Sequence, residues 1–198
     1  LPGRHIGDSI NLAQLLPAAL EADGLGGAMV LLDIAKAYDT VDRGFLLAAM
    51  RAHGAGEGML RWVQLLLLDT RACTVTRGHV SRAATWQAGV RQGCPLSPAL
   101  YLFIAEALAC WLRANATVGV TVAGTRYVSS HHADDTKVFL TSLTDASMAA
   151  LMQHLGVFSA ASGQRINAAK SATVLIGTQQ APAPLPPQDL LAELPPPQ

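Results

Sequence analysis

The feature that most constrains the fold is a short apolar run that ends in an acidic residue. Residues 28–32 read AMVLL, and Asp33 follows directly. Such a run, preceded by the glycine-rich residues 24–27, is typical of a strand buried on both faces of a sheet. Covering both faces requires a substantial core, and 198 residues with 51% hydrophobic content supply one.

The rest of the pattern alternates between helices and strands. Ser97 is expected to cap one helix with its hydroxyl, with Pro98 in the first turn. Thr144 is expected to open another helix, which Gly163 ends. This order predicts an α+β fold with antiparallel hairpins. Further helices are expected at residues 9–22, 45–53 and 58–68, a hairpin at 73–86 with its turn at Gly78, and strands at 28–33, 119–122, 136–140 and 172–176.

Composition separates the end of the chain from the rest. Residues 181–198 hold seven of the eleven prolines, so residues 178–198 are predicted to form a disordered tail.

The net charge of zero argues mildly against nucleic acid as a partner, because phosphate binding favours a basic excess. Three scattered cysteines favour a reducing, intracellular compartment, nuclear or cytoplasmic. Apolar stretches fall short of the roughly 20 residues of a membrane span, so no membrane partner is expected.

Three carboxylates fall at predicted strand ends. Asp33 ends one strand, while Asp134 and Asp135 lie side by side at a tight hairpin turn. Adjacent carboxylates repel each other, and a divalent cation is the natural compensation. Oxygen ligands favour Mg²⁺ or Mn²⁺, and two such ions can support phosphoryl transfer. The alternative is a solvated turn, since aspartate is a common turn residue.

The sequence around these acids resembles that of the reverse transcriptases of non-LTR (LINE-like) retrotransposons. Residues 31–42, LLDIAKAYDTVD, resemble motif A, and residues 89–98, GVRQGCPLSP, resemble motif B. Residues 132–136, HADDT, are similar to motif C, residues 162–171 to motif D, and residues 1–8 to the element that precedes motif A. The resemblance implies that residues 1–177 form a polymerase palm with partial fingers: an antiparallel sheet with helices packed on one face.

Residue by residue, the resemblance implies a two-metal site. Asp33, Asp134 and Asp135 would hold two Mg²⁺ ions, or Mn²⁺ in their place. Lys170 would approach the pyrophosphate leaving group as a charge stabiliser and proton donor. Without the resemblance, Lys170 is an ordinary solvated lysine.

Four further residues would bind the nucleotide. Tyr38 would be the steric gate that excludes a 2′-hydroxyl, although a core aromatic is the plain alternative. Gln92 and Gly93 would line the pocket, because glycine lets the backbone approach a ligand closely. Arg91 would contact template or phosphate, with a surface ion pair as the alternative.

Other polar residues are expected to be structural. Asp39 and Asp42 are expected to cap a helix or to pair with Lys36 and Arg43. The pair at His131 and His132 has no Cys or His partner at metal-ligand spacing, which argues against zinc.

The implied activity is RNA-directed DNA synthesis from dNTPs on an RNA template and a DNA primer. His132 departs from the family pattern, which has Tyr or Phe there. No upstream finger motif or downstream thumb is present, and the chain starts at Leu1, so we expect a piece of a larger retrotransposon polyprotein. The alternatives are an inactive relic that serves as a nucleic-acid-binding module, and a two-metal nuclease that uses the same acids.

Overall fold

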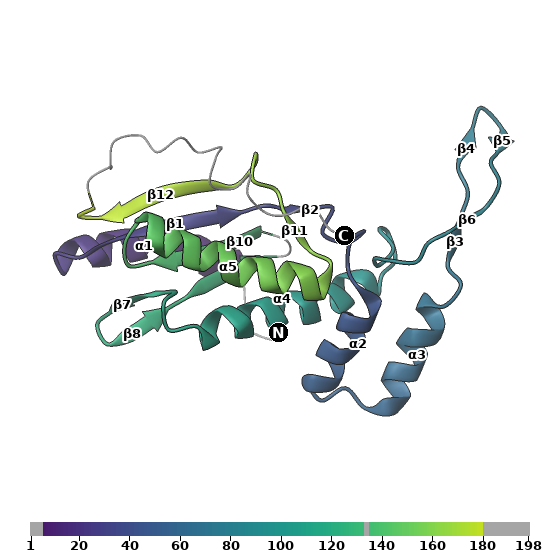
Figure 1. Cartoon of the computed structure of the whole chain (residues 1–198), viewed down its shortest axis with the longest axis horizontal. Coiled ribbons are helices and arrows are strands. Elements are labelled where there is room, and N and C mark those ends of the chain that lie inside the picture. The colour runs from purple at the N-terminus through teal and green to yellow at the C-terminus, as the bar shows by residue number, and fades with distance from the viewer. Residues whose placement is uncertain (1–5, 133–134, 180–198) are drawn as a thin grey trace.

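The centre of the molecule is a four-stranded antiparallel sheet with strand order β12-β1-β10-β9 (Figure 1). The computed structural model describes residues 6–132 and 135–179, so Asp134 and residues 180–198 of the predicted tail lie outside the described residues. The four strands are β1 (Gly26–Leu32), β9 (Ser129–His132), β10 (Asp135–Leu140) and β12 (Ala172–Gly177). Together with the helices, this sheet confirms the predicted α+β class.

Each face of β1 belongs to a different hydrophobic core. Ala28, Val30 and Leu32 pack with residues of α4 (Ser97–Ala114) and α5 (Asp145–Ser162). Met29 lies on the opposite face, against the core built around Leu16 of α1 (Ile6–Ala22). The apolar run of β1 is therefore covered on both sides, as predicted. The expected helical layer on one face is α4 with α5, and α1 is an additional cover on the other face.

Local capping explains where two of these helices begin and end. Thr144 accepts a hydrogen bond from the backbone N–H of Ser147 at 3.1 Å, and α5 ends at Gly163 in the left-handed region, as predicted. The prediction that Ser97 caps α4 is wrong. Its backbone N–H already donates to Cys94 O at 3.1 Å, so Ser97 is the first residue of the helix and is buried.

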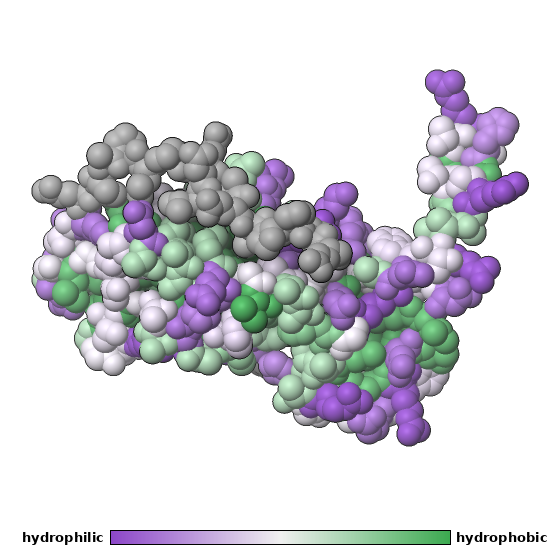
Figure 2. Space-filling model, viewed as in Figure 1, coloured by the Kyte–Doolittle hydropathy of each residue, from purple (hydrophilic) through white to green (hydrophobic). Residues whose placement is uncertain are grey.

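Helices α2 (Arg43–Ala52) and α3 (Glu57–Leu67) form a separate lobe beside the sheet (Figure 1). From α3 the chain enters a narrow β arm, where β3 (Arg71–Ala72) pairs with β6 (Ala84–Thr85) and β4 (Val75–Thr76) pairs with β5 (His79–Val80). Both turn residues of the arm, Arg77 and Gly78, have positive φ, so the predicted hairpin is confirmed. Figure 2 shows apolar side chains gathered on α3, where Met59, Trp62, Leu65 and Leu66 are exposed.

Four short strands were not anticipated, and β9 of the central sheet is one of them. β7 (Val120–Val122) pairs with β8 (Thr125–Tyr127), whereas the sequence pattern set residues 119–122 against the strand that begins at 136. β2 (Ile34–Ala35) follows Asp33 and pairs with β11 (Arg165–Ile166), which brings the motif D segment onto motif A. In the part of the chain that the structure describes, no helix combines the length and apolar character needed to cross a membrane.

Candidate active site

Two of the three predicted metal ligands lie at the same end of the β1–β10 ladder. The antiparallel register of β1 and β10 pairs Leu32 with Thr136. Asp33 follows the last residue of β1 and Asp135 is the first residue of β10, so the two residues adjoin this last pair. Continuing the register by one residue would set Asp33 opposite Asp135, with Cβ atoms about 4.5–5.5 Å apart. Asp33 is half-buried and Asp135 is exposed, and Asp134 lies outside the described residues.

The turn after β11 fixes the backbone of Asp33 on both sides. The N–H of Asn167 donates to Asp33 O at 2.8 Å, and the N–H of Asp33 donates to Ser171 Oγ at 3.2 Å. Ser171 Oγ donates in turn to Asn167 O at 2.9 Å. Lys170 belongs to this same turn and is exposed. The structure thus places Lys170 in a segment that contacts the backbone of Asp33. Sequence reasoning missed Ser171, whose partner is 138 positions away.

Motif B joins motif A through its first glycine. Gly89 N–H donates to Val41 O at 2.8 Å, and Val90 N–H donates to Tyr38 O at 2.7 Å. A Cβ atom on Gly89 would lie 2.5 Å from Asp39 O and 2.7 Å from Tyr38 O, and the φ of this residue is +80°. Only glycine allows this approach of two backbones, so the two motifs form one unit.

The polar residues of motif A contact other elements than the sequence suggested. Asp39 accepts hydrogen bonds from Gln92 Nε2 at 3.1 and 3.2 Å, so the expectation that it caps or pairs with Lys36 is wrong. Asp42 caps α2 by accepting from Phe45 N–H at 2.7 Å, as predicted.

Arg43 has a structural role at the base of the lobe formed by α2 and α3. Its guanidinium donates to Leu67 O at 2.6 Å and to Gly89 O at 3.0 Å. Partial burial lowers its pKa from the ordinary value. Arg43 therefore connects α3 with the start of motif B through backbone carbonyls, and it leaves Asp42 to its capping role.

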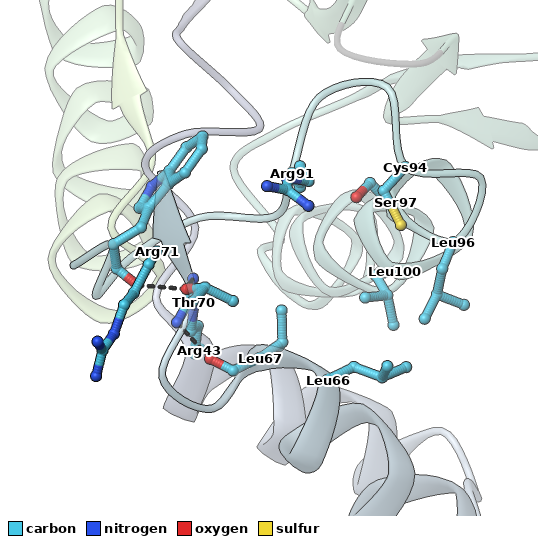
Figure 3. A pocket seen from close by; sticks show the side chains of 11 residues that line it. Arg43, Leu66, Leu67, Thr70, Arg71, Arg91, Cys94, Leu96, Ser97 and Leu100 are labelled. Carbon is cyan, nitrogen blue, oxygen red and sulfur yellow. Dashed lines mark hydrogen bonds between the residues drawn. The ribbon is translucent and has the colours of Figure 1, made fainter. Parts of the chain in front are cut away.

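The predicted nucleotide-binding turn is open on one side. Gly93 has φ +80°, and among the described residues no atom lies within 4 Å of a Cβ built on it. Arg91 and Gln92 are exposed. Arg91 lines a pocket of about 280 Å³ together with Cys94 and Leu96 (Figure 3). A backbone N–H of Leu96 lowers the pKa of the Cys94 thiol, with smaller contributions from Ser97 and Arg91.

A second group of potential ligands lies between α2 and α4. The ligand atoms of His53, Glu106 and Cys110 fall within 4.8 Å of one another. Arg113 Nη2 donates to Glu106 Oε1 at 2.5 Å and to Cys110 Sγ at 3.2 Å. The guanidinium therefore already supplies the positive charge that a cation would bring to this cluster.

The histidine that precedes motif C is engaged with hydroxyl groups. One ring nitrogen of His131 lies 2.8 Å from Ser129 Oγ, and the other lies 3.1 Å from Thr136 Oγ1. His132 is exposed and pairs with Asp135 across the β9–β10 hairpin.

Sequence reasoning also missed the buried Gln164, because nothing in the local pattern of motif D marks one of its side chains as internal.

The antiparallel sheet with its covering helices is a palm-like α+β fold, and sequence comparison identifies the family. Residues 9–188 match the model of the family described as "Reverse transcriptase (RNA-dependent DNA polymerase)". Because this match covers most of the chain, the protein belongs to the reverse transcriptase family. Members of this family generally use divalent metal ions.

Within that family, the relatives come from LINE-like, non-LTR retrotransposons. The chain is 32% identical over 179 residues to "Transposon TX1 uncharacterized 149 kDa protein" of Xenopus laevis. The aligned region covers 90% of this chain and 14% of that protein. It is 29% identical over 149 residues to the Pol polyprotein of a type-1 retrotransposable element R2 of Popillia japonica, covering 75% of this chain and 21% of that one. The chain thus spans about a fifth or less of these relatives.

A solved structure shares the fold. Apo telomerase from Candida tropicalis superposes with a TM-score of 0.60 over 90% of this chain and 36% of the telomerase chain, at 12% sequence identity. At that identity the similarity concerns the fold, and it is consistent with the palm-like α+β arrangement.

Proposed function

We propose that this chain is the catalytic palm, with part of the fingers, of an RNA-directed DNA polymerase. The reaction would add a deoxynucleotide to the 3′-hydroxyl of a DNA primer on an RNA template. The observation that carries the proposal is the position of Asp33 and Asp135 at the same end of the β1–β10 ladder. The motif D turn is bonded to the backbone of Asp33, and motif B is bonded to motif A through Gly89 and Val90, which supports a shared site.

Asp33, Asp135 and Asp134 would hold two Mg²⁺ ions, or Mn²⁺ in their place. The donor set fits, because carboxylate oxygens are the ligands that hard divalent cations prefer. The hydrogen bonds from Asn167 and to Ser171 hold the Asp33 backbone in one orientation, which suits a residue that must present its carboxylate at a fixed position. When bound, the ions would stabilise negative charge on the attacking and leaving oxygens.

The nucleotide would lie against the motif A loop and the motif B turn. Tyr38 would contact the sugar and exclude a 2′-hydroxyl. Gln92 and Gly93 would line the pocket, which is supported by the open side of Gly93. A dNTP would enter over that open backbone, because a side chain there would occupy the space.

Two exposed basic side chains would handle phosphate charge. Arg91 would contact the template or a phosphate group, beside the motif B turn. Lys170 would neutralise charge on the departing pyrophosphate and supply a proton to it. The turn that connects Lys170 to the Asp33 backbone supports this assignment.

The test is primer extension by the purified chain on an RNA template with dNTPs and Mg²⁺. Wild type should extend the primer, and Asp33→Asn and Asp135→Asn should each lose extension. Asp23→Asn is the matched control, because Asp23 is exposed in the turn after α1. Extension that is equal in wild type and Asp135→Asn, or that is absent from wild type, would contradict the proposal.

A second candidate, an inactive nucleic-acid-binding module, is favoured by His132. This residue lies across from Asp135, where the family has a larger aromatic ring to support the primer. If the chain is such a module, it binds a primer–template duplex but neither wild type nor His132→Tyr extends the primer. Extension that increases in His132→Tyr would instead support a polymerase with weakened primer support.

A further inference from the structure

Two buried polar side chains outside the predicted site connect motif A, motif D and helix α4. Gln164 is 1% exposed and Tyr101 is 2% exposed. The Tyr101 hydroxyl donates to Gln164 Oε1 at 3.1 Å. Gln164 Nε2 donates to Ala37 O at 3.0 Å and lies 3.2 Å from Thr40 Oγ1. Gln164 therefore holds the motif A loop on both sides of Tyr38.

The same tyrosine contacts Tyr38 directly. The rings of Tyr38 and Tyr101 stack with centroids 4.9 Å apart and an interplanar angle of 15°. The hydroxyl end of Tyr101 is fixed by Gln164, and its backbone lies in the first turns of α4. Tyr38 therefore rests on a ring that is itself held at both ends.

The chemistry of Gln164 indicates positioning more than stability. A buried amide without partners is costly, and its hydrogen bonds do little more than offset its desolvation. Leucine has nearly the same volume and needs no partners. What the amide provides is direction: its acceptor faces α4 and its donors face the motif A loop. The two segments are thereby kept at a fixed spacing, and the Tyr38 ring lies between them.

We propose that Gln164 and Tyr101 are positioning residues that hold the Tyr38 ring in place and so set how strictly ribonucleotides are excluded. The consequence for the sugar rests on the proposed function, in which Tyr38 contacts the nucleotide. The positioning itself is a property of the fold and can be measured without catalysis.

The first test follows Tyr38 by fluorine NMR. The chain has three tyrosines, so labelling with 3-fluorotyrosine gives three signals, which single Tyr→Phe variants assign. Gln164→Leu should shift and broaden the Tyr38 signal while the Tyr127 signal, from β8, stays in place. Tyr101→Phe removes only the hydroxyl and keeps the ring stack, so it should have the same effect to a smaller degree. Gln153→Leu is the control, because Gln153 is exposed on α5.

The second test measures the ratio of ribonucleotide to deoxynucleotide incorporation in primer extension. The ratio should rise roughly tenfold in Gln164→Leu, because the free energy of one hydrogen bond that aligns Tyr38 corresponds to about a factor of ten. The ratio should rise further in Tyr38→Val. An unchanged Tyr38 signal in both variants, with only a lower melting temperature, would overturn the proposal. A shifted Tyr38 signal with an unchanged ratio of ribonucleotide to deoxynucleotide incorporation would overturn the inference that these residues set sugar selection. Absence of extension by wild type would count against the proposed function alone, because the fluorine signals still decide the positioning.

Discussion

Replacing Gly89 with alanine should strongly destabilise the protein at the joint between motifs A and B. Two costs add at this position. The φ of +80° lies in a region that costs a residue with a side chain about 1–2 kcal/mol. The new Cβ would also lie 2.5 Å from Asp39 O, a backbone atom that cannot rotate away. Overpacking of this kind costs about 1–3 kcal/mol.

The free energy of unfolding should therefore fall by about 2–5 kcal/mol in Gly89→Ala. For a chain of this size, that corresponds to a melting temperature about 4–20 °C lower. Urea denaturation followed by circular dichroism, with thermal melts, measures both quantities. The primer-extension activity should fall as well, because the loop that carries Tyr38 must move.

A matched control separates the two costs. Gly54 has a similar φ of +84°, but among the described residues nothing lies within 4 Å of its Cβ position. Gly54→Ala should therefore lose only the backbone cost of about 1–2 kcal/mol. If Gly89→Ala is no less stable than Gly54→Ala, motifs A and B do not pack as described.

Two further predictions concern single side chains. Thr144→Ala removes the hydrogen bond to the Ser147 N–H at the start of α5 and should cost about 1 kcal/mol of unfolding free energy in urea titrations; an unchanged midpoint would contradict the capping role. Alkylation of Cys94 should begin at a lower pH in the folded chain than in the chain unfolded in urea, because a backbone N–H of Leu96 lowers the pKa of its thiol in the folded state. Peptide mass spectrometry across a pH series measures both rates, and an identical rate profile in the two states would refute it.

Local rules predicted those parts of the fold whose determinants lie close together in the sequence. Thr144 and Gly163 mark the ends of α5, and Gly78 marks the hairpin turn, because caps and turns depend on a few neighbouring residues. The prediction for Ser97 failed because a turn precedes the helix: the Ser97 N–H donates to Cys94 O, so Ser97 is already inside the helix. The two-residue strands β2 and β11 were missed because their pairing is decided by tertiary packing.

The candidate site was predictable to the extent that its residues stand in ordered motifs. Asp33 was predicted at a strand end, and the structure has it directly after β1, at the end of the ladder where β10 begins with Asp135. The partners that hold the site could not be found in this way. Gln164 bonds to Ala37 across 127 positions, and Asp39 bonds to Gln92 across 53 positions, whereas only its near neighbours had been considered. Hydrogen bonds between residues so far apart in the sequence produce no periodic pattern from which they could be predicted.

Asp33 and Asp135 should act together at the same end of the β1–β10 ladder as ligands of a divalent ion. Titration of the chain with Mn²⁺, with free Mn²⁺ measured by electron paramagnetic resonance, tests it most directly. Wild type and the Asp23→Asn control should bind Mn²⁺ alike, and Mg²⁺ should compete. Asp33→Asn and Asp135→Asn should each weaken binding by about tenfold or more. Mn²⁺ binding of equal strength in all four proteins would contradict the account.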